Sequence, residues 1–342
     1  MSGREDRRPV VDAHAHVLLP ALQGMVAERD PEGFAAAQQL DGRRQGRESS
    51  AVSGEMIRER FERLTRLPRR LADMDATGVD VQVVSPSPSH YYPWAGRQLA
   101  EDVARAANRA TAELVAEAPD RLVGLGLIAL QHPDLCVALL DDALEQGLAG
   151  VEISSFAPGV ELSDARLDPF WARAAETGAV LFLHPFGCSL DERLDRYYLS
   201  NTVGQPAENA VALSHLIFGG VLDRHPGLRI VAAHGGGYLP TAIGRSDHAW
   251  RTRPDSRSCA ELPSSYLRRL WFDSLTHSPV QLRALIDAAG ADRVLLGSDY
   301  PFDMGSEDPV GAVREAALDP EIEDAVLSGT AAALLPVPEG AR

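Results

Sequence analysis

Four histidines and one aspartate stand directly after apolar runs, where buried strands would end. His14 and His16 form a His-Ala-His triplet, and alternate residues of a strand share a face, so both imidazoles would point the same way. His184, His234 and Asp299 close three further apolar runs. Such imidazole and carboxylate groups predict one divalent metal ion as cofactor, with Zn²⁺ as the first candidate and Mn²⁺, Fe²⁺, Co²⁺ or Ni²⁺ as alternatives.

Asp299 lies in the stretch Leu-Gly-Ser-Asp-Tyr-Pro-Phe-Asp at residues 296–303. Taken alone, an aspartate between a strand and a loop is usually a turn-former. Only the other strand-end residues turn Asp299 into a candidate ligand. Glu152 also stands near the end of an apolar run, and its side chain could face either the sheet interior or a helix.

The elements that must position these side chains alternate regularly along the chain. Eight apolar runs predict buried strands, and segments of helical period lie between them. The strands are expected at residues 10–17, 79–85, 122–130, 149–155, 179–184, 229–233, 270–275 and 293–298. The helices are expected at residues 54–77, 97–118, 133–146, 164–177, 207–224, 241–252, 279–289 and, in broken form, 309–335.

Eight buried strands in βα alternation predict an α/β fold of the TIM type, a (β/α)8 barrel. A doubly wound open sheet is the alternative, which the lack of a Gly-rich phosphate loop after the first strand disfavours. Residues 18–60 have little apolar period and predict an insertion after strand 1 that contributes to the substrate pocket. We also expect an extended loop after strand 5 and a single domain over residues 1–342. In such barrels the strand ends meet at one mouth, where the chemistry occurs.

Composition limits the possible partners. The net charge of −16 argues against nucleic acid, and an anionic substrate would need local positive charge. No run of about 18 apolar residues predicts a membrane span. The charged stretch Met1 to Pro9 lacks an apolar signal core, and three cysteines form no disulfide framework, so we expect a cytoplasmic location.

Lysine is absent from the sequence, and all 33 basic residues are arginines. Codon bias explains this composition most simply. One chemical consequence is firm, because a site that depends on a carbamylated or Schiff-base lysine cannot form in this chain.

Five motifs are distinctive: His14-Ala15-His16, His184-Pro185, Ala233-His234-Gly235-Gly236-Gly237, residues 297–302 (Gly-Ser-Asp-Tyr-Pro-Phe) and residues 74–82 (Met-Asp-Ala-Thr-Gly-Val-Asp-Val-Gln). Together they resemble motifs of the amidohydrolase superfamily, and within it the branch of 2-amino-3-carboxymuconate-6-semialdehyde decarboxylase. The similarity extends over nearly the whole chain. It departs at Phe186, where that branch commonly has tryptophan, and in the first loop.

The resemblance implies a role for each residue of the site. The metal ligands would be His14, His16, His184 and Asp299, and His234 would transfer protons, with Asp299 sharing in that step. The implied reaction is non-oxidative decarboxylation of an unsaturated or aromatic carboxylic acid. The alternative is a hydrolase or hydratase that uses a metal-activated water on a lactone, an amide or a double bond. The family's lysine-bridged pair of metals is excluded by composition.

The resemblance also implies substrate contacts. Arg58 falls at the position of a substrate-binding arginine, although Arg60 or Arg63 could serve instead. Arg245 and Arg253 match arginines that project from a neighbouring subunit, so we expect a homodimer with Arg253 acting in trans. The remaining candidates for substrate contact are aromatic: Trp94, Phe186 and Phe302.

Overall fold

The computed structural model describes residues 8–338, with the backbone alone at residues 191 and 192. Residues 1–7, most of the charged N-terminal stretch, and residues 339–342 of the expected single domain lie outside the described residues. No described helix is long and apolar enough to cross a lipid bilayer.

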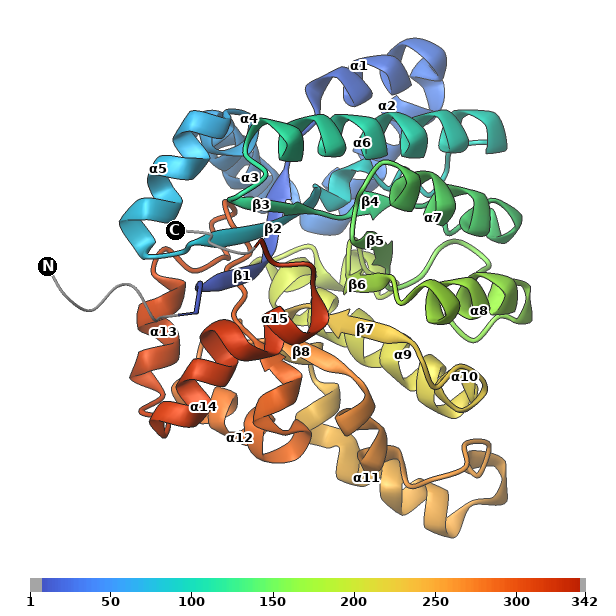
Figure 1. Ribbon diagram of the computed structural model, residues 1–342. Helices are drawn as coiled ribbons and strands as arrows, with labels where there is room; N and C mark the ends of the chain where they lie inside the picture. Colours follow the sequence, from blue (N-terminus) through green and yellow to red (C-terminus); the bar gives the residue numbers. More distant parts are fainter. Residues whose placement is uncertain (1–7, 339–342) are drawn as a thin grey trace, which may run out of the picture.

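Short parallel strands form the centre of the structure (Figure 1). Nearly every strand residue is buried, as expected for strands covered on both faces. Within the described residues the strands are β1 (Val11–Val17), β2 (Val81–Pro86), β3 (Leu122–Gly124), β4 (Gly126–Leu127), β5 (Gly150–Ser154), β6 (Val180–His184), β7 (Arg229–Ala232), β8 (Trp271–Asp273) and β9 (Val294–Leu295).

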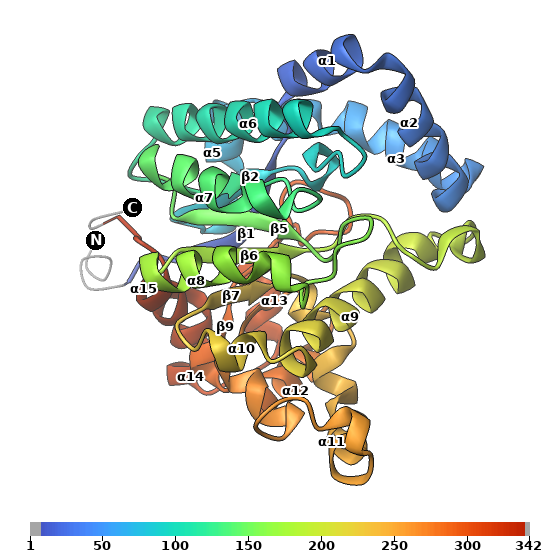
Figure 2. The ribbon, with the colours of Figure 1, turned by 90° about the vertical axis from the view of Figure 1, so that its right-hand side faces the viewer.

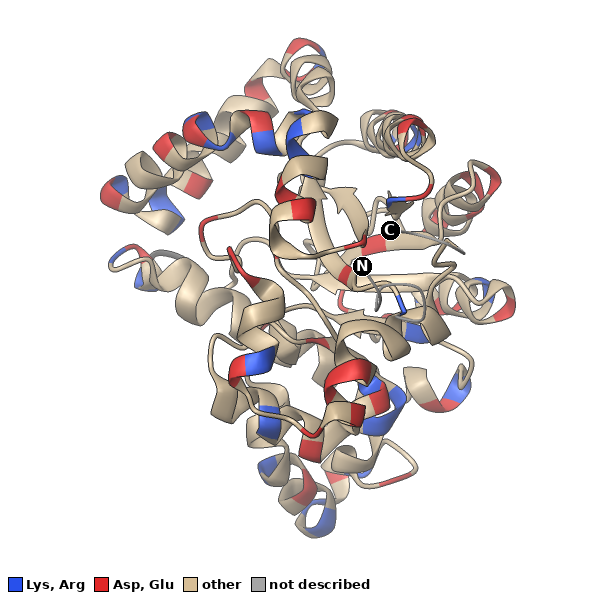
Figure 3. Cartoon of the chain, turned by 60° about the vertical axis from the view of Figure 1, so that its left-hand side comes forward, with Lys and Arg blue, Asp and Glu red and all other residues tan. Residues whose placement is uncertain are grey.

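Helices surround the strands and carry most of the charged side chains (Figure 3). Many of these helices begin with proline at a first-turn position, where the missing N–H costs no hydrogen bond. They are α1 (Pro20–Arg29), α2 (Pro31–Gln45), α3 (Arg47–Glu59), α4 (Phe61–Thr65), α5 (Leu67–Thr77), α6 (Arg97–Glu117), α7 (Cys136–Glu145), α8 (Asp168–Thr177), α9 (Gln205–Phe218), α10 (Val221–Arg224), α11 (Leu239–Thr252), α12 (Pro279–Ala289), α13 (Pro309–Glu315), α14 (Pro320–Asp324) and α15 (Thr330–Leu334).

Two parallel sheets account for the strands, in the orders β1-β2-β3 and β4-β5-β6-β7-β8-β9. Backbone hydrogen bonds continue between the sheets at both ends. The N–H of Leu125 donates to the carbonyl of Val84 over 2.9 Å, and the N–H of Ala13 donates to that of Leu296 over 2.8 Å. The prediction of an α/β fold with parallel strands is confirmed.

Several predicted strand boundaries were wrong, because an apolar run can extend beyond the residues that pair with a neighbouring strand. The run at 122–130 is divided at Leu125 into β3 and β4, and its last residues lie outside any strand. The run at 293–298 contributes only β9, so Asp299 stands in a loop beyond the last strand residue. Apolar character reports burial, and these loop residues are buried without being paired in a ladder.

Residues 18–60 form α1, α2 and α3, which extend beyond the layer of helices packed on the strands (Figure 2). Neither α2 nor α3 has a fully buried residue. A helix that buries no stripe of side chains needs no apolar period. This explains why the sequence of α2 lacks a helical pattern.

Inward-facing side chains fill the space between the strands. Phe182 of β6 is fully buried among Val11, Val83, Val180 and Val231. At the other end of this inner core, α15 contributes apolar side chains that close it. The inner core therefore supports the strand ends where the polar residues gather.

Candidate metal centre

The structure brings together all five strand-end residues. Ligand atoms of His14, His184, His234 and Asp299 all lie within 4.8 Å of one another. His16 adjoins them, with its Nε2 atom 3.0 Å from Nε2 of His14 and 3.3 Å from Oδ1 of Asp299. His234 is the most exposed of the five, with 16% of its side chain accessible, whereas the side chains of His14 and His16 are fully buried.

A β-bulge in β1 directs the first two histidines. Between Asp12 and Ala15 the register of β1 shifts by one residue against β2. Asp12 contacts Gln82, while His14 packs against Phe182 of the inner core with ring centroids 4.8 Å apart. Oδ1 of Asp12 accepts the N–H of His14 over 3.2 Å. A bulge commonly re-aims side chains next to functional sites, and here it turns His14 inward.

Two of the clustered residues have backbone conformations that side chains other than glycine rarely adopt. His234 has φ 55° and Asp299 has φ 56°. Such strain costs roughly 1–3 kcal/mol per residue and persists only where the surrounding structure enforces it. Gly237 follows with φ 63°, and an added Cβ there would lie 2.3 Å from the carbonyl of Pro206. The loop after β7 is therefore built for close packing that holds His234 in place.

Asp273, which the sequence analysis did not single out, supports two histidines. Its Oδ2 atom lies 2.6 Å from Nδ1 of His14 and accepts the N–H of His234 over 2.9 Å. Its Oδ1 atom accepts the N–H of Gly235 over 2.7 Å. A carboxylate on the outer nitrogen of a metal-binding histidine fixes the ring and its tautomer. The only signal in the sequence was an acidic residue within the apolar run at 270–275.

The side chain of Glu152 points into the interior between the strands and not toward a helix, and it lies beside His16. Its Oε2 atom accepts the hydroxyl of Ser85 and lies 3.5 Å from Nδ1 of His16. Its Oε1 atom accepts the hydroxyl of Tyr91 over 2.6 Å. Burial raises the pKa of Glu152 to about 8.

The donor atoms fit a divalent cation. Among the described residues, Nδ1 and Nε2 of His184 and Oδ1 of Asp299 are buried atoms that make no hydrogen bond. Buried polar atoms are normally satisfied, so such atoms call for an explanation. Three of them beside further imidazoles form the nitrogen and oxygen donor set that Zn²⁺ and similar ions take.

The pKa values of the clustered residues also fit a bound divalent cation. Burial lowers the pKa of His16 to about 4 and holds the pKa of His184 well below its ordinary value. Burial also opposes charge on Asp299, but the positive charge of His14 outweighs it and keeps the pKa of Asp299 low. For His14 the same attraction exceeds the effect of burial and raises its pKa to about 10. Neutral imidazoles and an ionised carboxylate are the forms that bind metal, and a cation here would replace the positive charge of His14.

A cavity of about 290 Å³ adjoins the cluster, between α2 and the loops after β2, β5 and β6. Tyr91 links the two, because its ring lines the cavity while its hydroxyl contacts Glu152 and the carbonyl of His184. Most of the wall is aromatic or aliphatic, and Asp41 and Arg44 of α2 bring charge to it. The aromatic residues in the wall are Phe34, Tyr91, Tyr92, Trp94, Phe156 and Phe186.

The predicted aromatic contacts lie near this site. Trp94 and Phe186 line the cavity. Phe302 lies beside the histidine cluster, with its ring centroid 5.5 Å from that of His16. His90 also lines the cavity, and its Nε2 atom accepts the N–H of Leu19 at the start of the 18–60 segment.

The predicted arginines lie farther from the cavity. Arg58 is exposed on α3. Arg60 donates to the carbonyl of Pro301 over 2.8 Å, and Arg63 pairs with Asp73 over 2.9 Å. None of the three is among the residues that line the cavity, whereas Arg44 is. The two arginines assigned to a neighbouring subunit are exposed, Arg245 on α11 and Arg253 directly after it.

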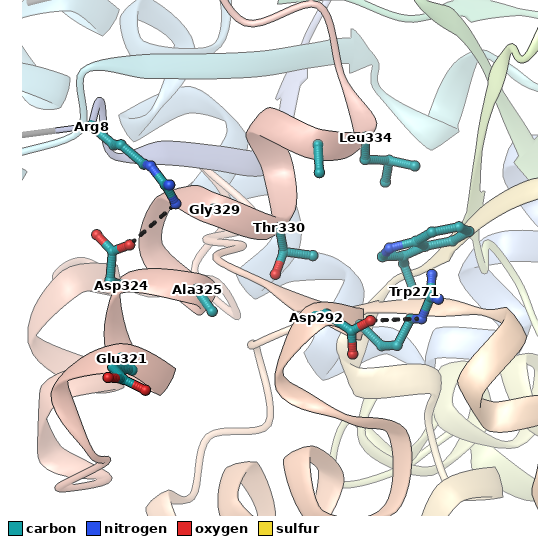
Figure 4. A pocket seen from close by; sticks show the side chains of 11 residues that line it. Arg8, Trp271, Asp292, Glu321, Asp324, Ala325, Gly329, Thr330 and Leu334 are labelled. Atoms are coloured by element: carbon teal, nitrogen blue, oxygen red, sulfur yellow. Dashed lines mark hydrogen bonds and ion pairs between the residues drawn. The ribbon is translucent and has the colours of Figure 1, made fainter.

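A second cavity, of about 370 Å³, lies at the opposite ends of the strands (Figure 4). Trp271 begins β8 and Arg293 precedes β9, and the guanidinium of Arg293 lies 4.5 Å from the centroid of the Trp271 ring. Neither cavity has a clustered histidine in its wall, but Tyr91 links the first cavity to the carbonyl of His184. Residues at this end of such folds serve stability rather than chemistry, so we place the functional site at the histidine cluster.

Comparisons with known proteins show the family of this chain. The amidohydrolase family model matches residues 11–337. The chain is 34% identical over 300 residues to 2-amino-3-carboxymuconate-6-semialdehyde decarboxylase of Dictyostelium discoideum, covering 86% of this chain and 82% of that protein. It is 29% identical over 301 residues to gamma-resorcylate decarboxylase of a Rhizobium species, covering 82% of this chain and 89% of that protein.

Solved structures share the fold. The crystal structure of 5-carboxyvanillate decarboxylase from Sphingomonas paucimobilis matches with a TM-score of 0.82 and 24% identity, covering 96% of this chain and 99% of that chain. A dihydroxybenzoic acid decarboxylase from a Polaromonas species, solved with bound manganese and the inhibitor 2-nitroresorcinol, matches with a TM-score of 0.80 and 22% identity, covering 96% of each chain.

We expect His184→Ala to lose the metal ion. Both ring nitrogens of His184 are buried without another partner, so no other role competes with ligation. Removing an outer partner of a ligand costs about 10–100-fold in metal affinity, so loss of the ligand itself should cost more than about 100-fold. Elemental analysis after dialysis measures the ion per chain. His248→Ala, exposed on α11, is the control. Retention of one ion per chain by His184→Ala would contradict the proposed centre.

Proposed function

This chain belongs to the amidohydrolase family, and we propose that it is a metal-dependent decarboxylase of an unsaturated or aromatic carboxylic acid. The observation that carries the proposal is the buried cluster of His14, His16, His184, His234 and Asp299 beside an aromatic-lined cavity. Relatives that match most of the chain are decarboxylases, which supports the same reaction here. For the ion we propose Zn²⁺, with Mn²⁺ as the alternative suggested by the Polaromonas structure.

We propose that the two sheets form one closed barrel of eight strands, with β3 and β4 as two parts of one strand. The hydrogen bonds from Leu125 to Val84 and from Ala13 to Leu296 support closure at both ends. An isolated parallel bridge between Ala15 and Tyr300 continues the contact between β1 and the segment after β9. Closure explains how residues from both ends of the chain share one mouth.

We assign the metal ligands as His14, His16, His184 and Asp299, and the proton carrier as His234. The cluster defined by mutual distance includes His234 in place of His16. Exposure favours our assignment, since His234 has the most accessible side chain of the four clustered histidines, at 16%, while His16 is fully buried against Asp299. The ion, when bound, would act as a Lewis acid on oxygen atoms of the substrate.

His234 would supply the proton that decarboxylation requires. The unsaturated carbon that carries the carboxylate first takes a proton from Nε2 of His234. The bond between that carbon and the carboxylate then breaks, carbon dioxide leaves, and the electron pair of the broken bond restores the double bond, while His234 regains a proton from water. Oδ2 of Asp299 lies 3.4 Å from this nitrogen, and Oδ2 of Asp273 accepts the backbone N–H of His234, so both carboxylates help to position the ring.

We propose that the 18–60 segment covers the substrate. Side chains of α2 at positions 34, 37, 38, 41 and 44 form one wall of the cavity, at the spacing of a single helix face. Arg44 brings a guanidinium to this wall, which suits an anionic group of the substrate. Trp94 and Phe186 would contact the apolar part of the molecule. Arg58 is exposed on α3 and does not line the cavity. It would contact the substrate only after a movement of α3.

We propose a homodimer in which Arg253 acts on the neighbouring subunit. Arg253 is 66% exposed and pairs with Asp255 over 2.8 Å within its own chain. The α11 helix that precedes it extends outward at the edge of the fold (Figure 2). An exposed guanidinium on a projecting element can reach a second copy, and its ion pair with Asp255 costs little to exchange.

We also propose a cytoplasmic location. Cys136, Cys188 and Cys259 are all free, and all three are buried. Thiols remain reduced in the cytoplasm, whereas oxidising compartments favour disulfides. Three unpaired cysteines suit the reducing environment.

Release of carbon dioxide from a candidate substrate tests the proposed reaction. We expect the metal-loaded protein to release carbon dioxide from at least one compound in a panel of carboxylated muconates and hydroxybenzoates, and to lose this activity after metal removal by a chelator. Gas release and product mass are measured together. Addition of water to the substrate without loss of carbon dioxide would instead identify a hydrolase or hydratase.

We expect His234→Ala to retain the metal ion and to lose most of its turnover. Loss of a positioned general acid typically lowers the rate by about 10²–10⁴-fold. Metal content and kcat are measured on the same preparation, with His248→Ala as the matched exposed control. A metal-free His234→Ala protein would show that His234 is a ligand and overturn our division of roles.

We expect Arg253→Ala to raise KM, because the mutant lacks a cation at the neighbouring site. Mixing it with His184→Ala should restore activity in heterodimers, where one site keeps both its ligands and the partner's arginine. Activity is measured after co-refolding or co-expression of the two variants. If mixing restores nothing although heterodimers form, action in trans is wrong.

A further inference from the structure

Arg70 is a buried cation behind the proposed metal centre. It lies on α5, is 2% exposed, and donates to two neutral oxygens: Oε1 of Gln82 over 2.5 Å and the carbonyl of His16 over 2.5 Å. Its guanidinium also lies 4.9 Å from the centroid of the Tyr300 ring. Burying a charge beside neutral acceptors is costly, so its position calls for a role.

The first set of contacts fixes the end of β1 against the loop that carries Asp299. The N–H of His16 donates to the carbonyl of Tyr300 over 2.7 Å, while the carbonyl of His16 accepts from Arg70. Because Arg70 also stacks on the Tyr300 ring, the three residues form a closed triangle. Asp299 directly precedes Tyr300, so this triangle sets the distance between Asp299 and His16.

The second set of contacts reaches the β-bulge. Gln82, held by Arg70, donates from Nε2 to Oδ2 of Asp12 over 2.9 Å. Oδ1 of Asp12 accepts the N–H of His14 over 3.2 Å and the N–H of Ser298 over 3.0 Å. Asp12 thereby ties the backbone that aims His14 to the residue before Asp299. Arg70 anchors this chain of hydrogen bonds from outside the sheet.

We propose that Arg70 is a positioning residue for the metal centre, which orients His14, His16 and Asp299 through their backbone without touching the ion. The inference rests on the proposed metal site. Ligand geometry must be kept within about 0.5 Å for full affinity. Strand ends do not provide such rigidity alone, because β1 is interrupted by its bulge and β9 ends before Asp299. The planar guanidinium of Arg70 contacts both the end of β1 and Tyr300, and so supplies this rigidity.

The test compares Arg70→Met and Arg70→Lys with Arg69→Met, a control on the same helix whose side chain is 49% exposed. Each protein is stripped of metal and titrated with Co²⁺, with affinity measured by chelator competition and ligand geometry by the visible absorption bands. We expect Arg70→Met to bind Co²⁺ about 10–100-fold more weakly, with shifted bands. Arg70→Lys should recover part of the loss, since an ammonium donates at one point only. Arg69→Met should match the wild type.

A purely structural role predicts a different result. In that case Arg70→Met and Arg70→Lys would unfold at lower temperature without metal, yet bind Co²⁺ with the affinity and bands of the wild type, and our inference would be wrong. If Arg70→Met does not fold, Arg70→Lys decides by the same two readouts. Failure of the wild type to bind Co²⁺ would instead overturn the proposed metal site itself.

Discussion

The buried carboxylate of Asp299 lies among imidazoles, and much of the surrounding structure serves to hold this carboxylate and these imidazoles together. One oxygen lies 3.3 Å from Nε2 of both His14 and His16, and the other lies 3.4 Å from Nε2 of His234. An ionised carboxylate so deeply buried requires positive charge nearby. Asp273 brings a second negative charge to His14, which deepens the requirement. A divalent cation would supply this positive charge. The same need for positive charge accounts for the low pKa of Asp299 and for the proposed cofactor.

Meeting that constraint strains the backbone at several points. His234 and Asp299 adopt left-handed conformations, and β1 carries its bulge between Asp12 and Ala15. Hydrogen bonds from outside the cluster hold these features: Asp273 fixes the backbone of His234, and Asp12 fixes that of His14 and Ser298. The buried hydrogen bonds that join Arg70, Gln82 and Asp12 therefore help to hold the cluster in place. The cavity wall formed by α2 contains none of these three residues.

Sequence periodicity predicted the order of strands and helices because burial on both faces leaves a continuous apolar run. The same reasoning placed His14, His16, His184, His234 and Asp299 at strand ends, from which their convergence follows once the strands are parallel. The resemblance to the amidohydrolase superfamily, carried by those motifs, is confirmed by the family match over residues 11–337. Strand boundaries were predicted poorly, since apolar loop residues such as Leu296 are buried without belonging to a ladder.

By itself, then, the sequence determined the class of fold, the set of ligand-type residues and the exclusion of a lysine-bridged centre, since these depend on residue type and period alone. Tertiary structure alone decided which groups support that set. Asp273 and Glu152 lie on other strands, and Arg70 reaches the end of β1 from α5. The sequence shows the first two only as acidic residues in apolar runs, and it does not show which histidine each of them contacts. Tertiary structure also decided that Arg44, rather than Arg58, lines the cavity, because the course of α2 and α3 depends on packing over the mouth. Contacts between residues distant in sequence are set by how elements pack, which residue order does not record.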